Sequence, residues 1–133
     1  MSGITDLHKL ISSMSPTLAQ DEFVFVTLPD ATYGSASHLA PIASFGEREG
    51  LTLIIPKDRA DAAALDYDET FRMITLQVHS SLSAVGLTAA VSGQLALRGI
   101  GANIVAAYFH DHVFVPSRQA EEALLALRQV GSG

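Results

Sequence analysis

The stretch from Phe71 to Pro116 decides the fold of this chain. It reads in order as FRMITLQV (71–78), HSSLSAVG (79–86), LTAAVSGQLALRG (87–99), NIVAAYFH (103–110) and DHVFVP (111–116). The first and the last two segments are rich in β-branched and aromatic residues, which predicts strands, and the third has the periodicity of an amphipathic helix. The second is small and hydroxylic, so it predicts a tight glycine loop that holds a small polar molecule through backbone groups and hydroxyls.

Length and composition indicate a globular protein with a real core. The chain has 133 residues, of which 48% are hydrophobic, and this suits one compact domain or two small units that share a core. No apolar run approaches the roughly 18 residues of a membrane span, and the first residues do not resemble a signal peptide. The sequence contains no cysteine, which excludes disulfides and thiolate metal sites and fits a cytoplasmic protein.

The charge balance argues against nucleic acid and anionic membranes as partners. The formal net charge is −6, with 8 basic residues against 14 acidic ones. The densest basic stretch, Lys57 to Arg59, is interrupted by Asp58. A nucleic-acid-binding protein needs a cationic face that releases phosphate counterions, and none is apparent here.

The rest of the chain has further strand and helix signals. Strands are predicted for residues 23–28, 42–46 and 51–55, and helices for 5–14, 56–65 and 117–130. We expect Ser117 to cap the last helix and Gly131 to end it.

Two internal matches indicate a duplicated unit. Residues 55–61 (IPKDRAD) match 115–121 (VPSRQAE) at an offset of 60, and residues 23–28 match 71–76 at an offset of 48. The offsets differ by 12 residues, so the N-terminal repeat lacks about one helix between its first two strands. The alternative is chance similarity between apolar strands. The duplication divides the chain into an abridged N-terminal repeat with a leading helix, residues 1–66, and a C-terminal repeat, residues 67–133.

The leading helix has an apolar stripe with no counterpart in the other repeat. Leu7, Leu10 and Met14 lie on this stripe. Because a missing helix leaves sheet surface uncovered, we expect the stripe to cover that surface in the N-terminal repeat.

The residues on either side of the predicted helix resemble a known family. SAVGLT (83–88) and GIGANI (99–104) are similar to the loop and strand entry of the ACT domain, a ferredoxin-like βαββαβ module. The whole chain resembles small stand-alone bacterial proteins with two tandem ACT-like units. The resemblance implies an α+β fold with antiparallel-rich sheets and helices on one face. It also implies amino-acid binding and regulation of metabolic enzymes, with ligands at interfaces between units. Val85 departs from the usual proline, and Ala102 is an additional residue before Asn103.

The candidate ligand site is the loop before the helix. We expect Ser80, Ser81, Ala84, Val85, Gly86 and Leu87 to form a cradle, chiefly through backbone groups. Free N–H groups at the helix start favour a carboxylate. Asn103 opens the next strand, and we expect it at the same edge, where its amide bonds the ligand. The alternative is that Ser81 or Ser83 only caps the helix and Asn103 satisfies local backbone groups.

Metal binding and catalysis have weaker support. His110-Asp111-His112 resembles a metal-ligand triplet, but it lies in a turn, and His79 lies at the opposite end of the predicted strands. His79-Ser80-Ser81 is not a hydrolase triad, because adjacent strand residues point to opposite sides. We therefore expect neither a metal nor a cofactor, and no enzymatic activity.

These patterns predict a non-catalytic regulatory protein that binds a small molecule, an amino acid in particular. We expect a homo-oligomer, such as a dimer. The alternative is a ligand-free protein-interaction or oligomerisation module, since exposed edge strands invite pairing.

Overall fold

The computed structural model describes residues 14–77 and 87–132, and these divide into two compact units. One unit, Met1–Gln20 and Arg72–Gly133, has two α-helices among its described residues and is called here the two-helix unit. The other, Asp21–Phe71, is called the abridged unit. The predicted boundary between residues 66 and 67 divides the sequence into repeats. The spatial division differs from it because the N-terminal segment up to Gln20 belongs with the second half of the chain.

Strand β1 (Thr17–Leu28) contributes to both units. Its residues up to Gln20 belong to the two-helix unit, and those from Asp21 belong to the abridged unit. Strand β4 (Phe71–Leu76) crosses the second boundary, after its first residue. The chain therefore passes between units inside strands and not through flexible linkers.

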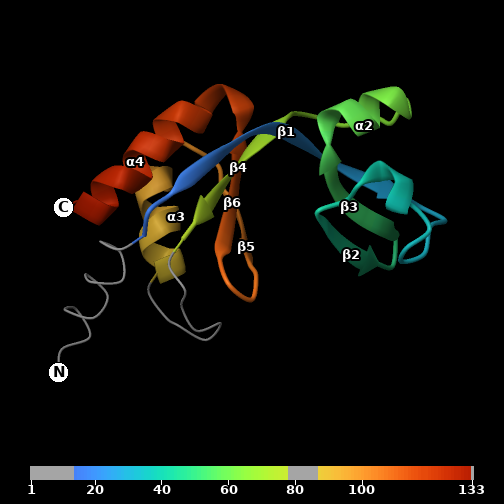
Figure 1. Ribbon diagram of the computed structural model, residues 1–133, viewed down its shortest axis with the longest axis horizontal. Coiled ribbons are helices and arrows are strands. Elements are labelled where there is room, and N and C mark those ends of the chain that lie inside the picture. The colour runs from blue at the N-terminus through green and yellow to red at the C-terminus, as the bar shows by residue number, and fades with distance from the viewer. Residues whose placement is uncertain (1–13, 78–86, 133) are drawn as a thin grey trace. The chain divides into compact units, whose positions relative to one another are not determined.

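The two-helix unit has the ferredoxin-like α+β arrangement predicted from the sequence. Its strands lie in the order β1-β4-β6-β5, and β5 and β6 are antiparallel. Both α-helices cover the same face of the sheet, as expected (Figure 1). Its remaining elements are α3 (Leu87–Leu97), β5 (Asn103–Ala106), β6 (Asp111–Pro116), η2 (Ser117–Gln119) and α4 (Ala120–Ser132).

Alternation along the strands builds the core of this unit. Ile74 and Leu76 of β4 and Val113 and Val115 of β6 are each at most 1% exposed and face the helices. Met14, at 1% exposure, packs into the same core. The expectation that Met14 covers the N-terminal repeat is therefore wrong, because this side chain belongs to the other unit's core. Leu7 and Leu10 lie outside the described residues.

Arg72 ties three elements of the two-helix unit together. Its Nε and Nη2 atoms donate hydrogen bonds of 3.0 and 2.9 Å to the Ala19 carbonyl oxygen on β1. Its Nη1 atom lies 3.6 Å from Glu121 Oε1 on α4. Since the guanidinium is partly buried, these contacts fix the start of β4 against β1 more firmly than an exposed ion pair would.

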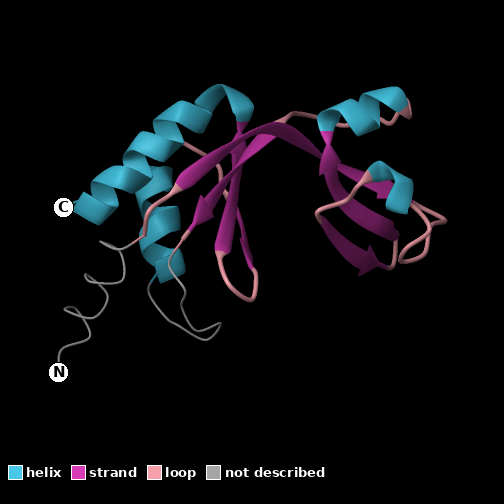
Figure 2. Cartoon of the chain, viewed as in Figure 1, coloured by secondary structure: helices cyan, strands magenta, loops and turns pink. Residues whose placement is uncertain are grey.

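The abridged unit has the order β2-β3-β1, with antiparallel pairing throughout. No α-helix separates β1 from β2, where the described chain has only a short 3-10 turn, η1 (Figure 2). This confirms the prediction that the N-terminal repeat lacks a helix between its first two strands. The elements are η1 (Ser37–Leu39), β2 (Ala43–Glu47), β3 (Gly50–Pro56) and α2 (Lys57–Ala62), the last shorter than predicted.

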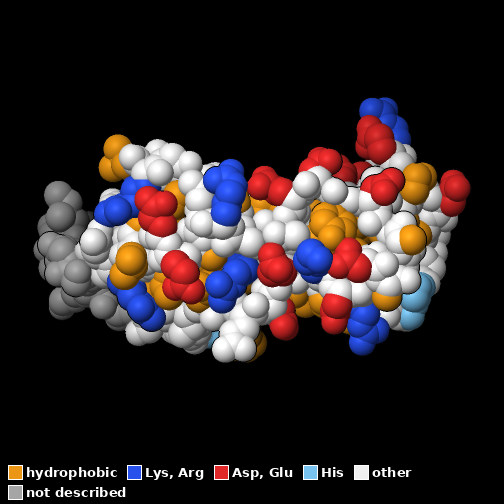
Figure 3. Space-filling model, turned by 90° about the horizontal axis from the view of Figure 1, so that it is seen from above, with side chains coloured by type: hydrophobic (Ala, Val, Ile, Leu, Met, Phe, Trp, Pro, Cys, Tyr) orange, Lys and Arg blue, Asp and Glu red, His pale blue; other side chains and the backbone are white. Residues whose placement is uncertain are grey.

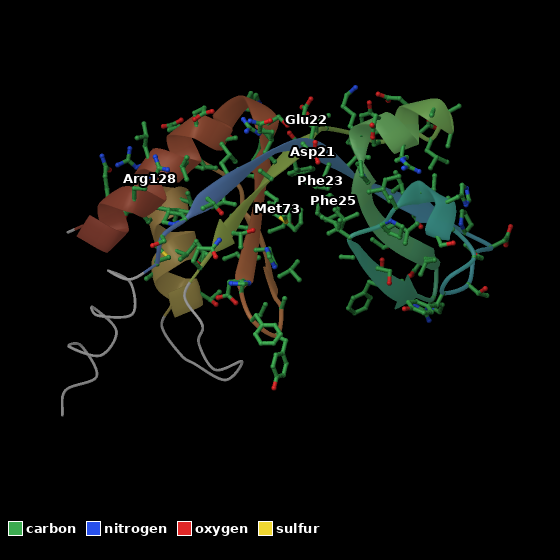
Figure 4. The ribbon with its side chains drawn as sticks, in the orientation of Figure 1. Asp21, Glu22, Phe23, Phe25, Met73 and Arg128 are labelled. Atoms are coloured by element: carbon green, nitrogen blue, oxygen red, sulfur yellow. The ribbon has the colours of Figure 1, made fainter. Side chains whose placement is uncertain are left out.

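The η1 segment takes over part of the missing helix's role. Ala36 and Leu39 are 5% and 4% exposed and pack with Leu53 and Val24 in the core of the abridged unit. On the opposite sheet face, Phe23 and Phe25 project from the same side of β1 (Figure 4). Phe25 stacks edge-to-face on Phe71, with 5.0 Å between ring centroids.

The ends of α4 differ from the sequence expectations. Ser117 does not cap a helix: its Oγ is buried without a hydrogen-bond partner, and Pro116 occupies the cap position of η2. Gly131 does not end α4, which continues to Ser132. The strong amphipathic pattern of α4 extends the helix past the glycine, although glycine is a poor helix former.

The distribution of charged side chains on the surface (Figure 3) agrees with the absence of a basic cluster in the sequence. Basic and acidic side chains are interspersed on the face shown in Figure 3, without a basic cluster. None of the helices in the described part of the chain is long and apolar enough to cross a membrane.

The backbone at Gly50 packs so closely against residues 28 and 29 that a Cβ atom does not fit without a shift. This contact predicts how a substitution changes the free energy of unfolding. A Cβ atom at this position would lie 2.9 Å from Pro29 Cα and 3.0 Å from the Leu28 carbonyl oxygen, at a φ of +155°. Gly50→Ala should destabilise the protein by about 1–3 kcal/mol, the usual cost of overpacking. Chemical denaturation measures the change.

The matched control is Gly46→Ala in the adjacent strand. A Cβ atom there meets nothing within 4 Å, so stability should change by less than about 0.5 kcal/mol. Equal effects of the two substitutions would show that the tight contact at Gly50 does not constrain the fold.

Candidate functional site

The end of β4, the β5–β6 turn and the start of α3 lie at one end of the two-helix unit, called here the hairpin end (Figure 1). Thr75, next to the last residue of β4, lies with its Oγ1 3.0 Å from His112 Nδ1 near the start of β6. At the other end, Gln119 Nε2 donates a 3.5 Å hydrogen bond to the Gly99 carbonyl oxygen just after α3. The loop between β4 and α3 therefore begins and ends at the hairpin end.

Most of the predicted ligand residues lie outside the described residues. This applies to Ser80, Ser81, Ala84, Val85 and Gly86, so their cradle stays a prediction. Leu87 is the first residue of α3, in agreement with a loop that leads into a helix.

Asn103 is the first residue of β5, exposed and paired with Phe114. The expectation that the end of β4 and the start of β5 share an edge is wrong, and so is the expectation that the end of β4 and the β5–β6 turn lie at opposite ends of the strands. His79 itself lies outside the described residues. His112 pairs with Val105, two residues after Asn103, whereas the loop starts at Gln77, two residues after Thr75. Asn103 is thus about four residues, or roughly 13 Å along the strand direction, from the start of the loop. The crossover through α3 makes β4 and β5 parallel, so the ends of the two strands lie together and the start of β5 lies at the opposite end of the sheet.

The hairpin end also carries two exposed aromatic side chains. Tyr108 and Phe109 in the β5–β6 turn are 72% and 61% exposed, and their rings form an edge-to-face pair at 4.9 Å. Their exposure was not predicted from the sequence. The available signal was two adjacent aromatic residues at a turn, where polar residues are usual.

The histidines of this turn are close but do not form a metal site with other described residues. The rings of His110 and His112 are 6.3 Å apart. Within residues 14–77 and 87–132, no three His, Asp or Glu side chains are grouped so that they would hold a metal ion. Burial, and then the neighbouring His110, lower the pKa of His112, and Asp111 opposes this shift.

The abridged unit has one polar network, on α2 and the segment after it. Lys57 Nζ lies 2.7 Å from Asp61 Oδ2, and the Tyr67 hydroxyl donates a 2.7 Å hydrogen bond to Asp61 Oδ1. The hydrogen bond from Lys57 lowers the pKa of Asp61, and the bond to Asp61 raises the pKa of Lys57 and of Tyr67. These shifts hold each group in its ordinary charge state, which is the opposite of what general acid–base catalysis requires.

Two sequence models of one family match the chain, each over about one half of it. A model described as ACT domain matches residues 2–72, and a second model with the same description matches residues 68–129. Among curated proteins, none matches the chain.

Several solved structures are similar over most of the chain. A Vibrio cholerae protein of unknown function, described as a possible transport protein, is 45% identical, with a TM-score of 0.89 and coverage of 98% of this chain and 99% of its own. An Agrobacterium tumefaciens protein is 17% identical, with a TM-score of 0.72 and 87% coverage of both chains. The ligand-free regulatory subunit of Thermus thermophilus aspartate kinase is 15% identical, with a TM-score of 0.60 and coverage of 89% and 98%. The two distant likenesses show the fold.

The lowered pKa of His112 predicts a loss of stability in mild acid. Its ordinary value is 6.5, so below that pH the unfolded chain takes up a proton that the folded chain does not. Stability contributed by the neutral ring is present above 6.5 and is lost as the pH falls toward the lowered pKa. His112→Gln should therefore lose less stability than the wild type between about pH 7 and pH 5. Urea denaturation at several pH values measures this difference, and parallel curves for the two proteins would contradict it.

Proposed function

The chain belongs to the ACT domain family, and we propose that it is a non-catalytic regulatory protein whose ligand is a small molecule, specifically a free amino acid. The observation that carries the proposal is the pair of tandem family matches, which together span residues 2–129. The fold shared with a subunit named as regulatory, that of Thermus thermophilus aspartate kinase, supports the same role. The cysteine-free sequence agrees with a cytoplasmic location.

The proposed site is formed by residues 80–87, between β4 and α3 in the chain. Support comes from its position directly after β4 and before α3, a helix of 11 residues. Free N–H groups at such a helix start favour a carboxylate, and the serine hydroxyls accept hydrogen bonds from an ammonium group. Asn103 is left out of the site because the structure places it near the other end of the sheet.

Regulation would follow from differential affinity. A ligand shifts an equilibrium between two arrangements of a protein only as far as it binds one arrangement more tightly. We propose that amino-acid binding at this loop favours one arrangement of subunits in a homo-oligomer, without any covalent step.

A second candidate function is a ligand-free interaction module. The observation in its favour is the hairpin end itself, where Tyr108 and Phe109 are exposed beside the edge strand β5. Exposed aromatic residues next to a free edge are typical of interaction surfaces.

A thermal-shift screen against the twenty amino acids tests the first function. A ligand at 100 times its dissociation constant stabilises the folded chain by about 2.7 kcal/mol, which shifts the melting temperature by several degrees. We expect one amino acid, or a closely related group, to give such a shift. Gly86→Asp, which adds a carboxylate to the loop, should weaken binding at least about tenfold through like-charge repulsion.

Gly101→Asp is the matched control, because it adds the same charge at an exposed position just before β5, at the other end of the two-helix unit. It should leave the affinity unchanged. No shift with any amino acid would favour the interaction module, and equal weakening by both substitutions would remove the loop from the site.

A further inference from the structure

A groove lies over the helix-bearing sheet face of the abridged unit, between the chain that links β1 to β2 and strands β2 and β3. It has two contiguous pockets of about 330 and 310 Å³, which share Tyr33, Ser44 and Leu51 in their walls. We call the first the neutral pocket and the second the charged pocket, and together the η1 groove.

The groove lies beside the η1 segment, which stands in the chain where the two-helix unit has α3. In the two-helix unit, α3 covers the inner face with Val91 and Leu95, which are 1% and 0% exposed. In the abridged unit Ala36 and Leu39 of the η1 segment and Ala60 of α2 cover this face, and Leu51 and Leu53 are 5% and 2% exposed. The two pockets lie along the edge of this cover, and their size matches the lower range of small-molecule sites.

The two pockets differ in chemistry. The neutral pocket is lined by small and apolar residues, including Ala36, Pro41 and Leu53, and by the hydroxyls of Ser37 and Ser44, with no charged side chain. Its size and lining suit an uncharged apolar body, such as an aromatic ring.

The charged pocket contains Glu47 and Arg48 at the turn between β2 and β3. The Glu47 carboxylate accepts a 2.5 Å hydrogen bond from the Thr52 hydroxyl. Arg48, in contrast, forms no ion pair with any described residue. Its guanidinium is therefore available for a carboxylate on a ligand.

We propose that the η1 groove is a second ligand site, distinct from the loop at residues 80–87, and that it binds small carboxylic acids with an apolar body. The apolar body occupies the neutral pocket, and the carboxylate faces Arg48. The exposed ring of Tyr33 stands where the two pockets meet and packs against the bound molecule.

Phenylacetate and its neutral isostere phenylacetamide test the proposal. Titration followed by NMR should show saturable binding of both, with shifts at the methyl groups of Leu51 and Leu53. The carboxylate should bind about fivefold more tightly, since an exposed charge pair contributes up to about 1 kcal/mol. Arg48→Gln should abolish this preference and leave the affinity for phenylacetamide unchanged.

Ser37→Trp fills the neutral pocket and should weaken both probes at least about tenfold. His38→Trp is the matched control, because His38 is exposed on the same turn but does not line either pocket. Circular dichroism verifies that both variants are folded.

Two results would overturn the proposal: absence of saturable binding of phenylacetate, or equal affinity of the wild type and Ser37→Trp. A preference for the carboxylate that persists in Arg48→Gln would remove Arg48 from the site. The proposal does not rest on the amino-acid site, since Gly86→Asp should leave phenylacetate binding unchanged.

Discussion

The apolar face of each sheet must be covered, and the rest of the structure depends on how the chain meets this requirement. The two-helix unit covers its face with α3, α4 and Met14, and the core residues are almost completely buried. The abridged unit has one short α-helix and the η1 segment for the same task. At about 25 cal/mol per Å² of apolar surface, an uncovered face would cost several kcal/mol, so the 3-10 turn with Ala36 and Leu39 is a structural necessity. The η1 groove lies where this short segment meets β2 and β3.

The long strand β1 imposes a second constraint. Its first residues pair within the two-helix unit and its later residues within the abridged unit, in a continuous run of 12 residues. A strand has a period of two, so a shift of one residue would turn every side chain to the other face. Arg72 opposes such a shift, because it holds the Ala19 carbonyl oxygen through two hydrogen bonds. The strand pairing in both units therefore depends on the register of β1.

Much of the architecture was predictable from the sequence, because it rests on local pattern. The strands of residues 71–76 and 111–116, the helix between them and the helix missing from the N-terminal repeat followed from periodicity and from the two offsets. The failures concern long-range geometry. The stripe that includes Met14 indicated a buried face but not which core would bury it. Asn103 was placed wrongly because strands joined by a helical crossover are parallel, which sets the start of β5 at the opposite end from the end of β4. Serine is a common N-cap residue, yet the Ser117 hydroxyl is buried without a hydrogen-bond partner. The groove arises from a volume that no side chain fills, and sequence pattern has no signal for it.

Amide hydrogen exchange of Leu39→Ala tests the central claim most directly, since this change removes the largest side chain that η1 contributes to the core. If η1 replaces the missing helix, the free energy of opening for amides of residues 51–55 should fall by about 2–4 kcal/mol, as for other buried leucines. Amides of residues 113–115, in the core of the two-helix unit, should lose less protection. Unchanged protection of residues 51–55 would contradict the account, because it would mean that the sheet face does not depend on the η1 segment for its cover.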